Sequence, residues 1–400
     1  MRIAFLCFQA FQRGGIRTYT RKLLNGIAAI GHEVVLFAPP PPAGTNTGLN
    51  PEVRVEPVVV PSLPLTSALA YWWSLPRILV RMERRDGRFD VVHSNVYADF
   101  LLSKRSARGV RIVTVYHLAN TAAESAGLQF HQRLSRLSSE YGPAVIAEGA
   151  CLKRADHIIA ISNFTRNDIL QRYPDIASGR VSVIYLGAST DSGPSPMNDK
   201  TALISSWGIG RGERIALAVG RLEDRKGVPF LLQALSQVPS GLNLKLVFIG
   251  SGRTDAHKAT ARRLGVADRV VFAGYVDDST LNAAYQSADV LVHAASMEGF
   301  GLAVADAVAI GLPVVATRVG SIPEVVRDGL DGYLVEYGNA KAFAKSVTEA
   351  VDDKQKLTRR GPRPQLTRFS WDRTVQETLD LYEGLVNGAK AVSEPVRLGG

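Results

Sequence analysis

Short apolar runs alternate along the chain with longer segments that place their apolar residues on one helical face. The runs are near-continuous and rich in β-branched residues, which is typical of strands buried on both faces of a parallel sheet. In the first half we expect strands at Ile3–Phe8, Val34–Phe37, Val53–Val60, Val91–His93, Ile112–Val115, His157–Ile161 and Val181–Tyr185.

The same alternation resumes after a polar segment that is rich in chain-breaking residues. That segment, Thr190–Lys200 (TDSGPSPMNDK), is the best candidate for an interdomain linker. Strands are then expected at Arg214–Val219, Leu244–Ile249, Val270–Phe272, Val290–Val292, Val314–Ala316 and Gly332–Val335. Alternating strands and helices predict parallel sheets covered by helices, an α/β fold.

The length of the chain predicts more than one domain. Its 400 residues exceed what one hydrophobic core usually organises. We expect an N-terminal domain over 1–190, a second domain over 191–369, a last helix over 370–387 and a tail over 388–400. After the first strand, a helix is expected over Ile16–Ile30, ended by Gly31.

The net charge of +10 indicates an anionic partner, either a nucleoside diphosphate, a membrane surface or a nucleic acid. Nucleic acid is the weakest of these, because no basic run interleaved with aromatic residues and no zinc-finger, RRM or helix-turn-helix pattern stands out. Cys7 and Cys151 are isolated, which favours a reducing compartment. Without a signal-peptide pattern or an apolar run of spanning length, we expect a cytoplasmic protein, with peripheral contact at the inner face of the cell membrane as an option.

The most informative stretch is Ser296–Ala316, where two acids flank glycines at the start of an apolar helix. Gly299 and Gly301 let the backbone approach a ligand and expose N–H groups at the helix start, which favours phosphate binding. Glu298 precedes the helix and Asp306 lies about a turn and a half inside it, so both can face one crevice. The simpler reading, an ordinary acidic helix start, explains the glycines and acids but not the whole pattern.

With these residues, the chain resembles the family 4 (group 1) glycosyltransferases of the GT-B fold over nearly its whole length. The likeness rests on an E-x7-E region, a glycine loop after the first strand, a G-R…K-G element, an F-x-G-x-V segment and the start of the last helix. In this chain these are Ser296–Ala316, Gly14-Gly15, Val219–Gly227, Phe272–Val276 and Ser370-Trp371. The resemblance implies two facing Rossmann-like parallel-sheet domains, with a C-terminal helix that returns to the N-terminal domain.

The resemblance also implies a reaction, the retaining transfer of a hexose-type sugar from a UDP-, GDP- or dTDP-sugar to a glycan, lipid or small-molecule acceptor. Arg221 and Lys226 would hold the diphosphate, Glu298 and His117 would address the sugar, and these four form the implied catalytic set. Asp306 would hold the ribose. The implied donor-binding residues are Gly14, Gly15, Gly220, Arg221, Lys226, Tyr275, Val276, Glu298, Gly299, Phe300, Gly301, Leu302 and Asp306.

Two positions depart from the family pattern. Asp306 stands where the family has glutamate, which is one methylene longer and would change the ribose contact. Tyr185–Ala188 replaces the common P-N-G-V, so the resemblance does not define the contact on the linker side. His93 also ends an expected strand, and it is either a packing residue or a candidate for the acceptor side.

No metal or cofactor is required by the pattern, since the sequence holds no Asp-x-Asp and its seven histidines show no ligand spacing. Two other functions share the same nucleotide or phosphate site. One is a nucleotide-sugar epimerase or phosphorylase of the same fold. The other is a non-catalytic partner that binds the donor for another transferase.

Two further segments belong to the N-terminal half. Tyr71–Arg85 combines aromatic and basic residues at helical spacing. It fits either an anionic bilayer surface or an amphipathic helix that covers the N-terminal sheet, and the second is favoured. Leu118–Tyr141 follows His117 and is expected to shape the acceptor site.

Overall fold

The computed structural model describes residues 1–60, 64–95, 98–103, 108–119, 142–188, 200–353 and 368–393. They form two compact units, divided after Leu186 and again after Ser370, and the last helix belongs to the first unit. The first division lies just before the linker expected at Thr190–Lys200, of which residues 190–199 are outside the described ranges.

The first unit is built on a parallel sheet of seven strands in the order β3-β2-β1-β4-β5-β6-β7. The expected strands are present, but β3 is shorter than Val53–Val60 and ends at Pro57, which has no N–H group for the ladder and suits an edge strand. The strands are β1 Arg2–Leu6, β2 Glu33–Ala38, β3 Arg54–Pro57, β4 Val91–Asn95, β5 Val110–Val115, β6 His157–Ala160 and β7 Val181–Val183.

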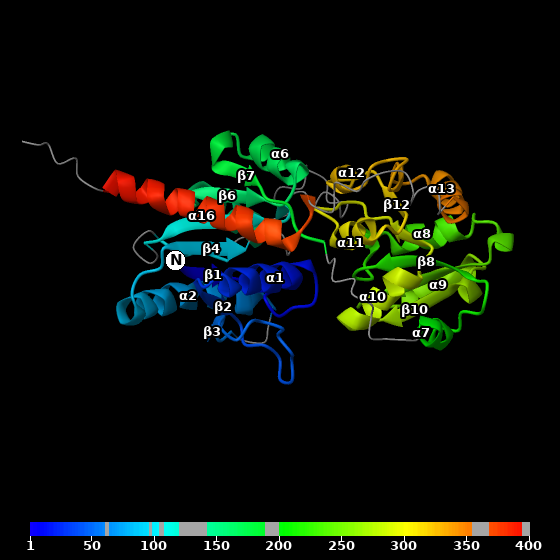
Figure 1. Cartoon of the computed structure of the whole chain (residues 1–400), viewed down its shortest axis with the longest axis horizontal. Coiled ribbons are helices and arrows are strands. Elements are labelled where there is room, and N and C mark those ends of the chain that lie inside the picture. The colour runs from blue at the N-terminus through cyan, green and yellow to red at the C-terminus, as the bar shows by residue number, and fades with distance from the viewer. Residues whose placement is uncertain are drawn as a thin grey trace, which may run out of the picture. The chain divides into compact units, whose positions relative to one another are not determined.

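Helices cover both faces of this sheet (Figure 1). On one face, α2 packs Tyr71, Leu75 and Leu79 against residues of β1, β2 and β4. On the other, α16 lies beside α1 so closely that a Cβ on Gly26 would be 2.5 Å from the Val375 side chain. The helices are α1 Gly15–Ala29, α2 Pro64–Asp86, α5 Gly142–Arg154, α6 Asn163–Arg172 and α16 Trp371–Ser393, with the short helix η1 at Ser178–Arg180.

The last helix is longer than expected. It was expected over 370–387, followed by a tail, but α16 continues to Ser393. The physical reason is that Pro395 is the first residue here that cannot be accommodated within a helix. Residues 394–400 of the expected tail lie outside the described ranges.

The second unit is built on a parallel sheet of six strands in the order β10-β9-β8-β11-β12-β13. Its strands are β8 Arg214–Val219, β9 Leu244–Ile249, β10 Val270–Gly274, β11 Val290–His293, β12 Val314–Thr317 and β13 Gly332–Val335. Its helices are α7 Lys200–Ser206, α8 Val228–Leu235, α9 Asp255–Arg263, α10 Asp278–Ser287, α11 Leu302–Ile310, α12 Ile322–Val325 and α13 Ala340–Asp352, with η2 Asp224–Lys226, η3 Ser240–Leu242 and η4 Ala267–Arg269.

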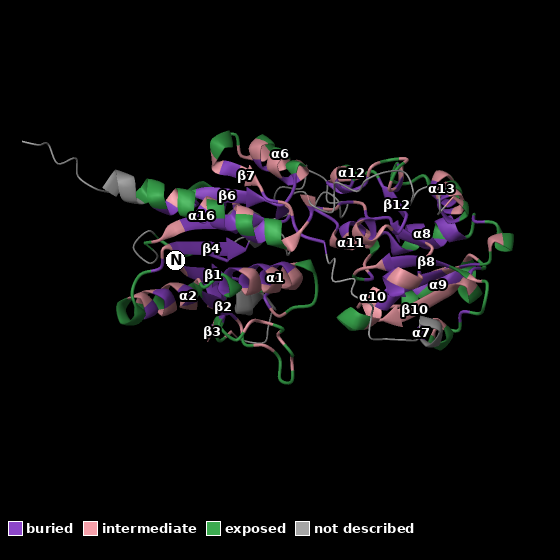
Figure 2. Ribbon diagram, in the orientation of Figure 1, coloured by how far each residue is buried: buried purple, intermediate pink, exposed green. Residues whose placement is uncertain are grey.

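The central strands of both sheets are buried, the edge strands β3 and β10 are less so, and the outer faces of the helices are exposed (Figure 2). This is why the strands read as near-continuous apolar runs and the helices as amphipathic segments. None of the described helices is both long enough and apolar enough to span a membrane.

Candidate donor-binding site

Most of the predicted site residues of the second unit lie at one edge of its sheet. Parallel strands point the same way, so the loops after β8, β10 and β11 all leave from the carboxyl edge. These loops carry three groups of predicted residues: Gly220, Arg221 and Lys226; Tyr275 and Val276; and Glu298 to Leu302. The strand order reverses between β8 and β11, which is where open parallel sheets bind ligands.

The loop after β8 approaches the loop after β11 closely enough to require glycine at position 227. Gly227 has a φ of +76° and ends the short helix η2. A Cβ at this position would lie 1.9 Å from the Ala294 carbonyl oxygen. The Ser296 N–H also donates to the Arg225 carbonyl at 3.0 Å. The two loops are therefore joined through their backbones, and Lys226 is placed beside the β11 loop.

At this junction three side chains meet. The Lys226 Nζ donates to Glu298 Oε2 at 2.6 Å, and His293 Nε2 lies 3.1 Å from the same oxygen. The three side chains are 21%, 13% and 7% exposed for Lys226, Glu298 and His293. Burial alone would raise the pKa of Glu298, but the Lys226 charge and the His293 hydrogen bond hold it well below its ordinary value. Glu298 is therefore a carboxylate at neutral pH.

The backbone of Glu298 is held as firmly as its side chain. The Ser321 N–H, in the loop after β12, donates to the Glu298 carbonyl at 3.1 Å. Gly320 has a φ of +53°, and a Cβ there would lie 2.0 Å from the same carbonyl oxygen. Three strands thus contribute to the position of this one acid: β8 through Lys226, β11 through His293 and β12 through Ser321.

Helix α11 begins at Leu302, shortly after this acid. Gly301, with a φ of +87°, is its N-cap. The first N–H groups of an α-helix have no partner within it and carry the positive end of its dipole. Asp306 lies one turn further along and is half-buried. Burial and the Asp306 charge raise the pKa of the neighbouring Tyr285.

Other predicted residues hold different positions at this edge. Arg221 is 55% exposed and pairs with Glu223 at 3.0 Å, so it is not drawn into the cluster of Lys226 and Glu298. Phe300 is buried, and its ring lies edge-on to that of Phe369 at 5.4 Å. Its side chain therefore packs in the core, and only its backbone groups could bind a ligand. Tyr275 is 50% exposed in the loop after β10.

Two protein families match consecutive parts of the chain. "Glycosyltransferase Family 4" matches residues 13–192, and "Glycosyl transferases group 1" matches residues 199–363. The chain belongs to the group 1 glycosyltransferases of the GT-B fold.

Similarity to other proteins extends over nearly the whole chain of this glycosyltransferase. An uncharacterized glycosyltransferase of Methanocaldococcus jannaschii is 26% identical over 96% of this chain and 98% of its own. A D-inositol 3-phosphate glycosyltransferase of Xylanimonas cellulosilytica is 28% identical, over 92% and 91%. Among solved structures, the sucrose-phosphate synthase of Thermosynechococcus elongatus has a TM-score of 0.79 at 22% identity, covering 97% of this chain and 99% of that one. HepE of Anabaena, in complex with UDP-glucose, has a TM-score of 0.75 at 19% identity, covering 96% and 100%.

The predicted residues of the first unit lie at the carboxyl edge of the seven-stranded sheet. Gly14, with a φ of +138°, is the N-cap of α1, and Gly15 is the first residue of that helix. His117 follows β5 and is half-buried. Most of Leu118–Tyr141, expected to shape the acceptor site of the transferase, lies outside the described ranges, namely residues 120–141.

His93 of this transferase is a packing residue. It is fully buried on β4, and its Nδ1 hydrogen-bonds the Tyr382 hydroxyl of α16, while its Nε2 lies 2.6 Å from Thr114 Oγ1. Burial lowers the pKa of His93 to about 3, so the ring is neutral. The histidine therefore ties the last helix to the sheet.

Three residues of the site were not anticipated from the sequence. His293 was missed because the expected strand ended one residue too early, at Val292. A histidine directly after an apolar run and five residues before Glu298 was the available signal. Gly320 and Ser321 gave no such signal, because their role depends on which loop lies beside Glu298. Within the described residues, no three histidine, cysteine, aspartate or glutamate side chains gather as metal ligands would.

Proposed function

We propose that this glycosyltransferase moves a hexose-type sugar from a nucleoside-diphosphate donor to a hydroxyl acceptor, with retention at the anomeric carbon. One observation carries the proposal: the contact between Lys226 and Glu298 at the reversal of strand order, in the loop that leads into α11. A cation and helix N–H groups suit the diphosphate, and a carboxylate suits the sugar hydroxyls.

The diphosphate is assigned to Lys226, Arg221 and the start of α11. An ammonium group has three N–H donors, and Glu298 takes one of them. Arg221 pairs with Glu223 at an exposed position, where an ion pair is weak and readily exchanged for a phosphate. As the bond from the anomeric carbon to the phosphate oxygen breaks, negative charge grows on the diphosphate, and these cations stabilise it.

The sugar is assigned to Glu298 and, on the family likeness alone, to His117. Since the pKa of Glu298 lies well below neutral, its oxygens accept hydrogen bonds and do not supply a proton. The acceptor oxygen bonds to the anomeric carbon on the face that the diphosphate leaves, and its proton passes to the departing phosphate oxygen. Asp306 is assigned to the ribose, and the backbone at Tyr275 and Val276 to the base.

The remaining assignments rest on the family likeness. Gly14 and Gly15 are assigned to the donor phosphates, with Gly220, Gly299, Phe300, Gly301 and Leu302 contributing backbone groups. Structures of HepE hold UDP and UDP-glucose, and several relatives are D-inositol 3-phosphate glycosyltransferases. UDP-sugars are therefore the first donors to test, and an inositol phosphate is the first acceptor.

The test is a panel of UDP-, GDP- and dTDP-sugars incubated with the purified protein, with and without inositol phosphate or other acceptors. Release of the nucleoside diphosphate together with a glycosidic product supports the proposal. The coupling constant of the anomeric proton in the product distinguishes retention from inversion. Binding without turnover would favour a donor-binding partner, and inversion at another sugar carbon would identify an epimerase.

The same assay tests whether a metal is needed. We propose that Lys226, Arg221 and the start of α11 neutralise the diphosphate without a divalent cation. Turnover should then stay within about twofold when EDTA is added in excess. Loss of turnover that magnesium or manganese restores would show that a metal shares the task.

A further inference from the structure

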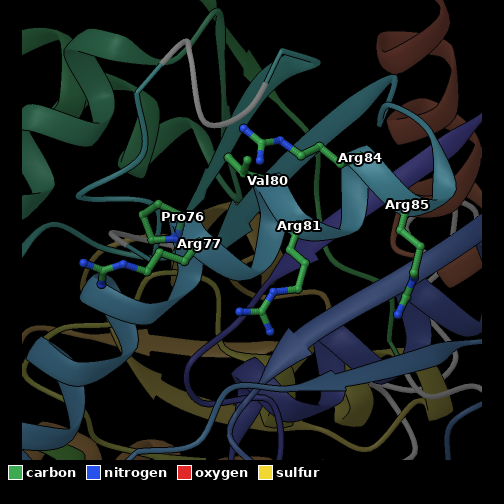
Figure 3. Close-up of a pocket in the computed structure, with 6 residues that line it drawn as sticks. All are labelled: Pro76, Arg77, Val80, Arg81, Arg84 and Arg85. Carbon is green, nitrogen blue, oxygen red and sulfur yellow. The ribbon is translucent and has the colours of Figure 1, made fainter.

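The outer face of α2 is strongly cationic. Its inner face is buried under the first sheet, where the Tyr71 hydroxyl donates to the Phe37 carbonyl at 2.9 Å. The opposite face lines a hollow of about 580 Å³. Figure 3 shows four arginines extending from successive turns of the helix around Pro76 and Val80; they are Arg77, Arg81, Arg84 and Arg85.

Little of this charge is neutralised by the protein. Arg85 pairs with Asp86 at 2.6 Å. Arg77 lies over the ring of Trp73, 4.7 Å from its centre. Among the residues that the structure describes, no carboxylate lies within ion-pair distance of Arg81 or Arg84, and both are exposed. Like charges three and four residues apart disfavour a helix, so this face is suited to an anionic partner.

Toward the N-terminus of α2, the same face of the helix is apolar. Leu69 and Trp73 are 54% and 64% exposed, and they precede Arg77 at intervals of four residues. Leu101 is also 43% exposed, and it follows Phe100, whose ring lies 5.0 Å from that of the buried Trp72 on the same helix. Exposed apolar side chains thus continue directly into the arginine-lined hollow.

We propose that this face of α2 docks on the surface of a bilayer that contains anionic lipids. Tryptophan and leucine enter the boundary between headgroups and acyl chains, where an amphipathic aromatic ring is well placed. The arginines reach the lipid phosphates, while their stems cover Pro76 and Val80. Charge complementarity and adjoining apolar residues together select this partner, because a nucleic acid or an acidic peptide would match the arginines only. The docking is independent of the transferase reaction.

The probe is a set of phosphatidylcholine vesicles, with or without 30% phosphatidylglycerol, and the full chain is co-sedimented with them at low and at high salt. Binding is expected only to the anionic vesicles and should fall as salt screens the charges. Arg81→Gln with Arg84→Gln should lower the partition coefficient by about thirtyfold, since each arginine at an anionic surface contributes roughly a factor of five. Native binding to neutral vesicles alone, or none at low salt, overturns the proposal.

The matched control is Arg262→Gln with Arg263→Gln, two exposed arginines on α9 of the second unit. This pair removes the same charge and should leave vesicle binding unchanged. Equal losses in the two double variants would mean that overall charge, and not α2, is responsible. Circular dichroism checks that each variant is folded.

A fluorescence measurement locates the contact. Brominated lipids quench tryptophans that enter the bilayer, and Trp73 is the exposed one on this face. Quenching should occur in the native chain and be lost in Trp73→Phe, with little change in sedimentation at low salt. Persistent quenching in that variant, or tighter binding of a short oligonucleotide than of the anionic vesicles, contradicts the proposal.

Discussion

Each unit of the molecule holds a largely buried glutamate, and the two acids behave in opposite ways. In the second unit, Glu298 contacts the Lys226 ammonium and His293, and its pKa is held below the ordinary value despite burial. In the first unit, Glu148 of α5 accepts hydrogen bonds from the Ala119 N–H at 2.7 Å and from the Tyr173 hydroxyl at 3.1 Å.

The partners of Glu148 are neutral, and they do not offset the loss of water. Burial raises the pKa of Glu148 from 4.5 to about 7. The charges that face it, Asp168 and Arg172 of α6, pair with each other at 2.7 Å and act on it in opposite directions. A cation in contact therefore decides whether a buried carboxyl keeps its charge. The second unit keeps a charge where a ligand is expected, whereas the first uses its carboxyl to join α5 to the loop after β5.

The largest effect among the predicted changes should come from removing the Lys226 ammonium group, which keeps Glu298 charged. Lys226→Ala should lower turnover by about 10²- to 10³-fold, the usual loss for one preorganised donor at a developing negative charge. It should also raise the pKa of Glu298, because burial is then opposed only by His293. The measurements are kcat with the accepted donor and a carbon NMR titration of the glutamate side chains.

Lys245→Ala is the matched control for this variant. Lys245 is in the same unit but pairs with Glu213 at 3.3 Å, at the start of the sheet's strands and away from the carboxyl edge. Its loss should leave kcat within about twofold. If both lysine variants keep native turnover, Lys226 has no place in the reaction.

The next effect is a pH dependence of stability in the first unit. Folded Glu148 holds its proton to about pH 7, whereas the unfolded chain releases it near 4.5. Its contribution to stability is therefore fully present below pH 4.5 and is lost as the pH rises through 7. Compared with Glu148→Gln, which does not titrate, the native chain should lose about 3 kcal/mol of unfolding free energy over this window.

Urea unfolding at a series of pH values, followed for the first unit, measures this difference. If the free energy of unfolding changes with pH in the same way in the native chain and in Glu148→Gln, Glu148 does not titrate in this window. Tyr173→Phe sharpens the test: it removes a hydrogen bond that lowers the pKa of Glu148, so the window should move to higher pH.

The fold was predictable from the sequence because its strands are buried on both faces. Apolar runs therefore mark β8, β9 and β13 to the residue, whereas β1 ends two residues before the expected Phe8. Strand ends were less predictable, since Pro57 shortens β3 and His293 extends β11. The end of β3 is marked locally by Pro57, whereas the end of β11 depends on a neighbouring strand, because His293 pairs with Ala316 of β12.

The candidate site was only partly predictable. Lys226 and Glu298 stood out through their motifs, but they are 72 residues apart, and their contact depends on β8 and β11 being neighbours. The charge state of Glu298 follows from that contact. Glu148 had no signal, because one of its partners is a backbone N–H group that any residue except proline would supply at position 119.

The smallest predicted effect concerns the neutral histidine of the first unit. Tyr382→Phe keeps the ring that lies edge-on to His93 but removes the hydroxyl that bonds its Nδ1. A buried ring nitrogen without a partner costs about 1 kcal/mol, so amides of α16 should exchange with deuterium roughly five times faster. Tyr285→Phe is the control: it removes a hydroxyl bonded to the Ala303 carbonyl in the other unit and should leave α16 unchanged. Native exchange in α16 of Tyr382→Phe would mean that apolar packing, such as Val375 against Gly26, holds this helix without help from His93.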